Sequence, residues 1–222
     1  MVKTSKLLVL PQRIQQLVSE KWWPVLLESS LVANYKKGSY IIRVGERDRF
    51  VRLGLSGWTA LQLGETILGL ASTAMTTNAV GKDLILATSD LVALTDVTAV
   101  LFDRDQFTEA LMDSPPSGLL TLLSWSARNL NMIQTFSAIK SNCPVDIGLA
   151  TMLWMLGEPS GDGRRKVPTG IPQQALARAL GASREEINRR RKALLDTGYL
   201  SKGEDGEYLD AMTPMLLAPF GF

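Results

Sequence analysis

The chain has 222 residues, of which 45% are hydrophobic and 21% charged, and its formal net charge is +2. This composition is that of a globular protein, and the length suits one large domain or two small ones. The single cysteine excludes an intrachain disulfide and a self-contained Cys-ligated cluster. The absence of histidine excludes His-ligated haem, the usual zinc sites and His-based acid–base or nucleophilic catalysis. No nucleophile–base pair, metal cluster or phosphate loop is recognisable, so we expect neither an enzyme nor a cofactor.

No apolar run is long enough to span a bilayer. Residues 1–20 lack the basic and then apolar order, and the cleavage site, of a signal peptide. We therefore expect a cytoplasmic protein with no membrane partner.

The first half of the chain changes pattern near Tyr35. Residues 7–31 are helical or mixed in character, with leucine, isoleucine and valine spaced for one buried face. From there to about Val100, short β-prone runs alternate with glycine turns. The runs cover residues 40–42, 50–53, 85–88 and 97–102. This spacing predicts a compact β barrel or roll of roughly eight short strands.

A short helix begins at residues 103–107 and ends near Pro115-Pro116, where a much longer helix starts. Apolar residues recur along it at spacings of three and four; they are Leu119, Leu122, Leu123, Ser126 (the one polar member), Leu130, Ile133, Phe136 and Ile139. A narrow apolar seam on a helix of this length favours a partner helix, most simply a second copy of the chain. The alternative is that the seam packs on the β domain.

Residues 171–200 read as two helices joined by a tight turn. Asn142-Cys143-Pro144 forms a hinge before this region, and a helix around 147–156 and a Gly- and Pro-rich connector, 157–170, lead into it. The first helix has Pro172 in its first turn, Leu176 and Leu180 on its expected buried face, and Gly181 as its stop. The second helix has Ser183 as N-cap, with Glu186 completing a capping box. Ile187 and Leu194 form its expected buried stripe. This is the pattern of a DNA-reading helix-turn-helix.

Five positions of the second helix face outward and have no core role: Arg184, Glu185, Asn188, Arg189 and Lys192. On a recognition helix such residues reach the major groove, where arginine binds guanine O6 and N7 and glutamate accepts from cytosine N4. Residues 164–192 hold nine Lys or Arg and two acids, a net charge of +7, so the rest of the chain sums to −5. A basic island on an acidic chain favours phosphate contact, although a solvated face is the alternative.

After the second helix, residues 200–209 hold two short apolar runs around an Asp-Gly turn, which predicts a β-hairpin. A helix-turn-helix followed by a hairpin is a winged helix. Lys202 on the wing could contact a phosphate or be a solvated turn residue.

With this order of elements, the chain resembles the Crp/Fnr family of bacterial transcription regulators along nearly its whole length. The segments that carry the resemblance are Tyr35–Glu46 (YKKGSYIIRVGE), 93–97 with 102–107, and 181–189 (GASREEINR). The resemblance implies an α+β fold with an N-terminal β-roll of jelly-roll type, 1–114, a dimerisation helix, 115–142, and a C-terminal winged helix-turn-helix, 143–222. It also implies a homodimer on double-stranded DNA that recruits or blocks RNA polymerase.

The resemblance also implies roles for single residues. The family's Arg-Glu-x-x-x-Arg reader falls on Arg184, Glu185 and Arg189, which would contact guanines and a cytosine of a TGTGA-like half-site. Gln174 and Ser183 match positions that bind phosphate. Arg190 and Arg191 depart from the family, which has aliphatic residues there: either the Arg191 stem snorkels over the domain edge or the helix sits differently.

The sensor end departs further from the family. The position of the ribose-binding glutamate holds Leu70, and that of the phosphate-binding arginine holds Ala87. Without the guanidinium, a buried cyclic phosphate loses its charge-assisted hydrogen bonds, so we expect no cyclic-nucleotide binding.

Three interpretations of the roll then remain. It binds another small effector, using Trp22, Trp23 or Trp58 where these are not packing residues; it is a rigid scaffold; or Cys143 responds to oxidants where it is not an inert apolar residue. A different class of function is a regulatory or scaffold protein whose winged helix binds an acidic protein partner in place of DNA.

Overall fold

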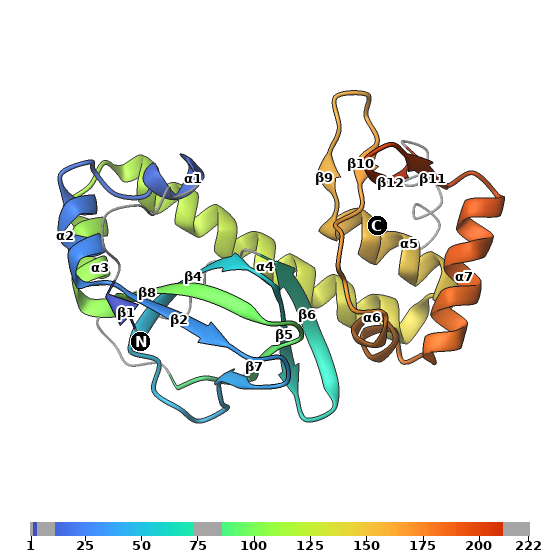
Figure 1. Ribbon diagram of the computed structural model, residues 1–222, viewed down its shortest axis with the longest axis horizontal. Coiled ribbons are helices and arrows are strands. Elements are labelled where there is room, and N and C mark those ends of the chain that lie inside the picture. Colours follow the sequence, from blue (N-terminus) through green and yellow to red (C-terminus); the bar gives the residue numbers. More distant parts are fainter. Residues whose placement is uncertain (1, 4–11, 73–85, 211–222) are drawn as a thin grey trace. The chain divides into compact units, whose positions relative to one another are not determined.

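The computed structural model describes residues 2–3, 12–72 and 86–210. Backbone contacts divide the chain into two compact units, residues 1–63 with 71–131 and residues 64–70 with 132–222. The roll is built mainly by the first unit and the winged helix by the second (Figure 1).

Two four-stranded sheets form the roll. The first has the strand order β1-β2-β8-β4, and its strands are β1 (Val2–Lys3), β2 (Leu31–Tyr35), β8 (Val97–Asp103) and β4 (Phe50–Ser56). The second has the order β3-β7-β5-β6, with β3 (Tyr40–Ile42), β7 (Asp90–Ala93), β5 (Trp58–Leu63) and β6 (Thr66–Ser72). The three predicted runs at 40–42, 50–53 and 97–102 are therefore strands, as expected.

Strand β8 lies between β2 and β4 and is buried on both faces, because residues 99–102 of this strand are all buried. Its alternate side chains Val100 and Phe102 face the same core as Val51 and Leu53 of β4. Three short helices complete this core: α1 (Gln12–Gln15), α2 (Trp22–Ser29) and α3 (Arg104–Met112). The Phe102 ring contacts both Trp23 and Phe107, at centroid distances of 6.2 Å and 5.7 Å.

The long helix α4 (Pro116–Asn142) starts with proline, whose missing N–H is harmless in a first turn. Its apolar residues face two ways within the first unit. Leu122 is buried in the core of the roll, whereas Leu119, Leu123 and Leu130 are exposed. One side of the helix thus packs on the β domain, and the other leaves a row of leucines in solvent.

Gly118 of α4 packs closely against the backbone of Leu17, in the segment after α1. A Cβ built at Gly118 would lie 2.0 Å from the carbonyl oxygen of Leu17. Alanine is a better helix former than glycine by about 1 kcal/mol, but here the clash is with backbone and outweighs that gain. We expect Gly118→Ala to lower the free energy of unfolding by about 2 kcal/mol. Thermal or urea unfolding measures this, and Gly161→Ala, which meets nothing within 4 Å, is the control.

The second unit contains helices α5 (Val145–Leu156), α6 (Gln173–Leu180) and α7 (Arg184–Asp196). A small sheet completes it, with the order β11-β12-β10-β9 and the strands β11 (Leu200–Gly203), β12 (Gly206–Leu209), β10 (Arg165–Lys166) and β9 (Glu158–Pro159). α7 contacts α5, α6 and β11. Leu149, Leu153, Leu176 and Ile187, each fully buried, come from these three helices and form the core of the winged helix.

The structure corrects two of the sequence predictions. Of the predicted run 85–88, residue 85 lies outside the described residues and 86–88 form no strand; Leu86 makes an isolated bridge with Arg47, and the backbone of Ala87 hydrogen-bonds with Gly45 and Glu46. The connector 157–170 contains the β9–β10 hairpin. Strands of two residues leave no alternating pattern, and a proline in one of them is tolerated because β9 is at the sheet edge. Of the predicted buried face in 7–31, Leu7, Leu8 and Leu10 lie outside the described residues.

Candidate DNA-binding surface

The turn between α6 and α7 forms as the sequence predicts. Leu176 and Leu180 are buried on one face of α6. Gly181 follows with φ +66°, the left-handed conformation that glycine adopts most readily. The N–H of Ala182 then donates to the carbonyl of Ala177 at 2.9 Å and closes the end of the helix. The direction of α7 is therefore set by local backbone geometry.

Ser183 caps α7, and its Oγ accepts from the N–H of Glu186 at 3.1 Å. The predicted capping box is only half formed. The carboxylate of Glu186 does not return to Ser183; it accepts from Arg189 at 2.8 Å and from Arg190 at 2.9 Å. Two guanidinium groups within one turn attract the carboxylate more strongly than one neutral N–H. These hydrogen bonds, that of Arg189 first, lower the pKa of Glu186.

All seven residues predicted to contact DNA are exposed; they are Gln174, Ser183, Arg184, Glu185, Asn188, Arg189 and Lys192. Ile187 and Leu194 point the other way and are buried. Two rows of side chains therefore run along the outer face of α7, one through Arg184 and Lys192 and one through Glu185 and Arg189. At 1.5 Å per residue the longer row spans about 12 Å of the helix axis.

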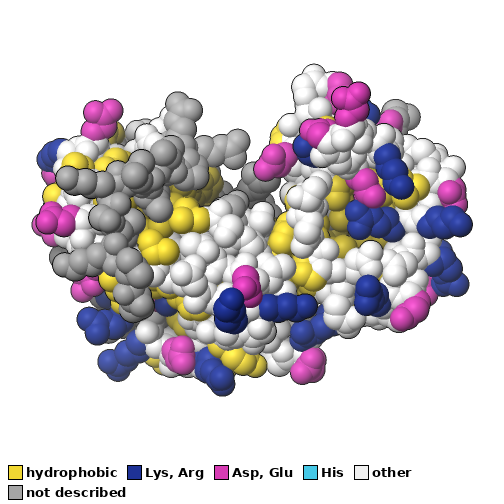
Figure 2. Space-filling view, in the orientation of Figure 1, with side chains coloured by type: hydrophobic (Ala, Val, Ile, Leu, Met, Phe, Trp, Pro, Cys, Tyr) yellow, Lys and Arg dark blue, Asp and Glu magenta, His cyan; other side chains and the backbone are white. Residues whose placement is uncertain are grey.

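Arg184 and Arg189 each make a weak contact within the protein. Arg184 Nε lies 3.4 Å from Oε1 of Gln173, the limit of a hydrogen bond. Arg189 pairs with Glu186, yet its side chain is 69% exposed. Exposed pairs of this kind contribute about 0–1 kcal/mol, so both guanidinium groups can leave them for a stronger acceptor such as a guanine edge. Figure 2 shows Lys and Arg side chains gathered over the outer side of the winged helix, where α7 lies.

The hairpin after α7 forms the predicted wing. β11 and β12 pair from Leu200↔Leu209 to Gly203↔Gly206, and Leu200 and Leu209 are buried at its base. Lys202 is exposed near the tip. β10 pairs with β12 and adds a further strand to the sheet of the wing. The sequence pattern did not predict this strand.

An ion pair ties β10 to the wing turn. Lys166 Nζ lies 2.5 Å from Asp205, which also accepts from the Tyr208 hydroxyl at 2.6 Å. Both interactions, that of Lys166 first, lower the pKa of Asp205.

Arg191 is a further functional candidate. The resemblance in sequence implies that it replaces an aliphatic residue of the family, but it predicts no partner for the arginine. Its side chain is half-buried and pairs with Glu207 of β12, 16 residues further along the chain. Neither helix periodicity nor the hairpin signal predicts a contact between the two. The N-cap at Ser183 also shows that α7 starts where the sequence predicts, so Arg191 departs from the family without a shift of the helix start.

No family model matches the sequence, and no curated protein matches it. Solved structures do. A mutant of CooA from Carboxydothermus hydrogenoformans superimposes with a TM-score of 0.66 and 16% identity, over 98% of this chain and 99% of that chain. For FixK2 from Bradyrhizobium japonicum the TM-score is 0.63 and the identity 15%, over 85% and 96%. A protein assigned as a Crp/Fnr-family regulator, from Eubacterium rectale, gives 0.55 and 17%, over 90% and 95%.

The fold is that of the Crp/Fnr regulators. The predicted α+β class, with a β-roll, a long helix and a winged helix-turn-helix, is therefore confirmed. The solved neighbours are described as regulators rather than enzymes where their names state a role. Within the described residues, no helix has the length and apolar character needed to cross a membrane.

The two positions that the resemblance predicts to replace nucleotide-binding residues, Leu70 and Ala87, belong to the roll. Leu70 on β6 is buried, with 1% of its surface exposed. The backbone of Ala87 is engaged with Gly45 and Glu46. Neither side chain offers a polar group to a nucleotide.

The tryptophans considered for an effector site pack or bond within the protein. Trp23 and Trp58 are buried in the roll, and Trp22 donates to Asp113 at 2.9 Å. Cys143, which follows α4, is half-buried, and burial raises the pKa of its thiol. The thiolate is the reactive form, so this environment disfavours oxidation.

Proposed function

We propose that the protein is a sequence-specific DNA-binding transcription regulator that binds a palindromic site as a homodimer. The observation that carries this proposal is the outer face of α7, where five polar or charged side chains lie exposed over about 12 Å of the helix axis. The surrounding stretch of residues 164–192 has a net charge of +7 on a chain that is otherwise acidic. A basic helix with no core role on that face suits a polyanion.

On this proposal Arg184 and Arg189 contact guanines, and Glu185 accepts from a cytosine. Asn188 lies beside them on the side that faces the bases. Gln174, Ser183 and Lys192 contact phosphates, which sets the register of the helix on the duplex. The half-site is TGTGA-like, following the family's Arg-Glu-x-x-x-Arg pattern. RNA polymerase is the partner that the bound dimer recruits or blocks.

The dimer follows from the exposed leucines of α4. Leu119, Leu123 and Leu130 lie at spacings of four and seven, which places them on one face of the helix. A second copy of the chain covers that face and brings two recognition helices to half-sites one helical turn apart, about 34 Å. Domains of 1–114, 115–142 and 143–222 then divide the chain into sensor, dimerisation helix and DNA reader.

The second candidate is a scaffold whose winged helix binds an acidic protein. The charge of α7 favours it as much as it favours DNA, but its outward glutamate does not, since Glu185 would face like charge. A mobility-shift titration with a TGTGA…TCACA duplex and with a scrambled duplex, at several salt concentrations, separates the two. We expect tighter binding to the palindrome and a steep fall of affinity with salt. Equal, weak binding to both duplexes would contradict sequence reading.

We also predict that cyclic AMP and cyclic GMP do not bind at micromolar concentration. A cyclic phosphate needs a charged partner in the roll, and Leu70 and Ala87 occupy the two positions that supply polar contacts in the family. Isothermal titration calorimetry checks this, with the Leu70→Glu, Ala87→Arg double variant as the gain-of-function control. Tight binding by the natural chain would show that the roll uses another set of residues.

A further inference from the structure

Arg191 leaves α7 on the side of the wing rather than toward the outer face. Its guanidinium holds one carboxylate oxygen of Glu207 through two nitrogens, Nη2 at 2.5 Å and Nε at 3.0 Å. The two side chains are 27% and 21% exposed. This fork fixes both the distance between helix and strand and the rotation of the guanidinium plane.

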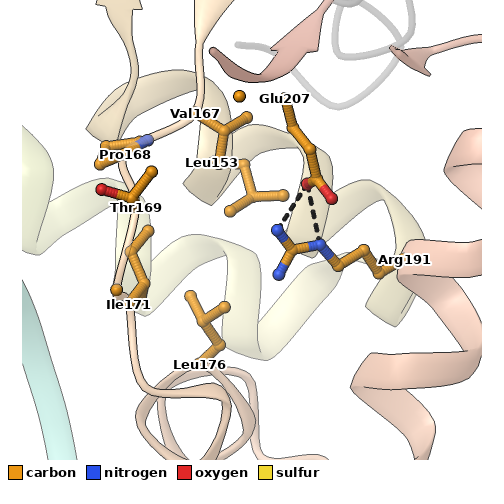
Figure 3. A pocket seen from close by; sticks show the side chains of 10 residues that line it. Leu153, Val167, Pro168, Thr169, Ile171, Leu176, Arg191 and Glu207 are labelled. Carbon is orange, nitrogen blue, oxygen red and sulfur yellow. Dashed lines mark hydrogen bonds and ion pairs between the residues drawn. The ribbon is translucent and has the colours of Figure 1, made fainter. Parts of the chain in front are cut away.

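The ion pair lies beside a cavity of about 250 Å³ in the winged helix (Figure 3). Leu153, Val167, Ile171 and Leu176 line the cavity with apolar side chains. Both side chains are less exposed than Arg189 is in its pair with Glu186, so solvent screens the attraction between the two charges less than it does there. The contact therefore holds its geometry better than the exposed pairs of α7 do.

Glu207 is central to the wing. Its backbone carbonyl accepts from the N–H of Val167 at 2.8 Å, which joins it to the end of β10. Across the hairpin it pairs with Lys202, and side chains of directly opposed residues lie on the same face. A side chain that fixes Glu207 against α7 therefore also fixes the position from which Lys202 extends.

We infer that Arg191 is a positioning residue, which holds the wing against the recognition helix so that Lys202 meets a DNA phosphate. This inference rests on the proposed function. Arg191 itself is no DNA contact here, because its charge is already neutralised and its side chain is half-buried. Replacing both members of such a pair by apolar side chains of similar size is often neutral or stabilising, whereas removing one member alone leaves an unpaired charge and costs stability. The role of the pair is in geometry.

The test is the effect of Lys202→Gln on DNA binding in four backgrounds of the full chain: natural, Arg191→Met, Glu207→Gln, and the charge-reversed double variant Arg191→Glu with Glu207→Arg. Methionine keeps the length of the arginine stem, and glutamine keeps the shape of the glutamate. Affinity for the palindromic duplex is measured by fluorescence anisotropy between 50 and 200 mM salt. Thermal unfolding of each variant confirms folding.

In the natural background, Lys202→Gln should weaken binding about 10-fold and reduce the slope of log affinity against log salt by about 2, because the dimer loses one phosphate contact in each half-site. In the Arg191→Met and Glu207→Gln backgrounds the same change should alter neither quantity, and charge reversal should restore both. A Lys202 effect of equal size in every background overturns the inference, as does the lack of any effect in the natural chain. Failure of the natural chain to bind duplex DNA is a different result, and it overturns the proposed function.

Discussion

Arg189→Ala should weaken binding to the TGTGA…TCACA duplex about 30-fold or more, because the dimer loses one bidentate arginine–guanine contact, worth about 1–3 kcal/mol, in each of the two half-sites. The guanidinium is exposed on α7, and its bond to Glu186 is an exposed one that DNA can displace. The effect should depend on sequence. With the contacted guanine replaced, the natural chain and the variant should bind equally. Fluorescence anisotropy against both duplexes measures the difference, and Arg184→Ala should act in the same way.

Lys192→Ala is the matched control, since it removes the same charge from the same exposed helix. Each copy of Lys192 is assigned to a phosphate, so the variant should weaken binding to both duplexes alike and reduce the salt slope of the dimer by about 2. If Arg189→Ala behaved like Lys192→Ala, with no dependence on the base, then Arg189 would be a phosphate contact and the base-reading assignment of α7 would be wrong.

The helix-turn-helix is the part of the fold that sequence predicts best, because each of its boundaries has a local chemical cause. Gly181 adopts a positive φ, Ser183 accepts from the backbone N–H three residues on, and both signals are readable without the partner elements. Strands β4 and β8 of the roll are predictable for a related reason: several residues along each strand are buried, so each leaves a run of apolar residues in the sequence.

What the sequence did not reveal depends on partners far away in the chain or on competition between side chains. Glu186 has the spacing of a capping box, but Arg189 and Arg190 compete for its carboxylate. The β9–β10 hairpin is too short to leave a pattern and exists because β12 pairs with β10. The partner of Arg191 is set by how the hairpin folds back, which no spacing in the sequence encodes.

Leu123→Glu should convert the protein to a monomer and weaken binding to the palindromic duplex about 100-fold or more, because two half-sites then no longer act together. Leu123 is 56% exposed on the same face of α4 as Leu130, which is 59% exposed. Glutamate is a good helix former, so the helix itself should persist, and a change at an exposed site should leave the unfolding free energy within about 0.5 kcal/mol. Sedimentation equilibrium gives the oligomeric state, and anisotropy gives the affinity.

Met112→Glu is the control for this experiment, since Met112 is 74% exposed at the end of α3 and lies outside the row of leucines on α4. It should leave both mass and DNA affinity unchanged. The two measurements must also move together. A Leu123→Glu monomer that still bound the palindrome with the natural affinity would place the DNA contacts in a single copy of the chain. A Leu123→Glu dimer would instead show that the exposed leucines of α4 are not the surface that pairs two copies, and the palindromic site would need another interface to explain it.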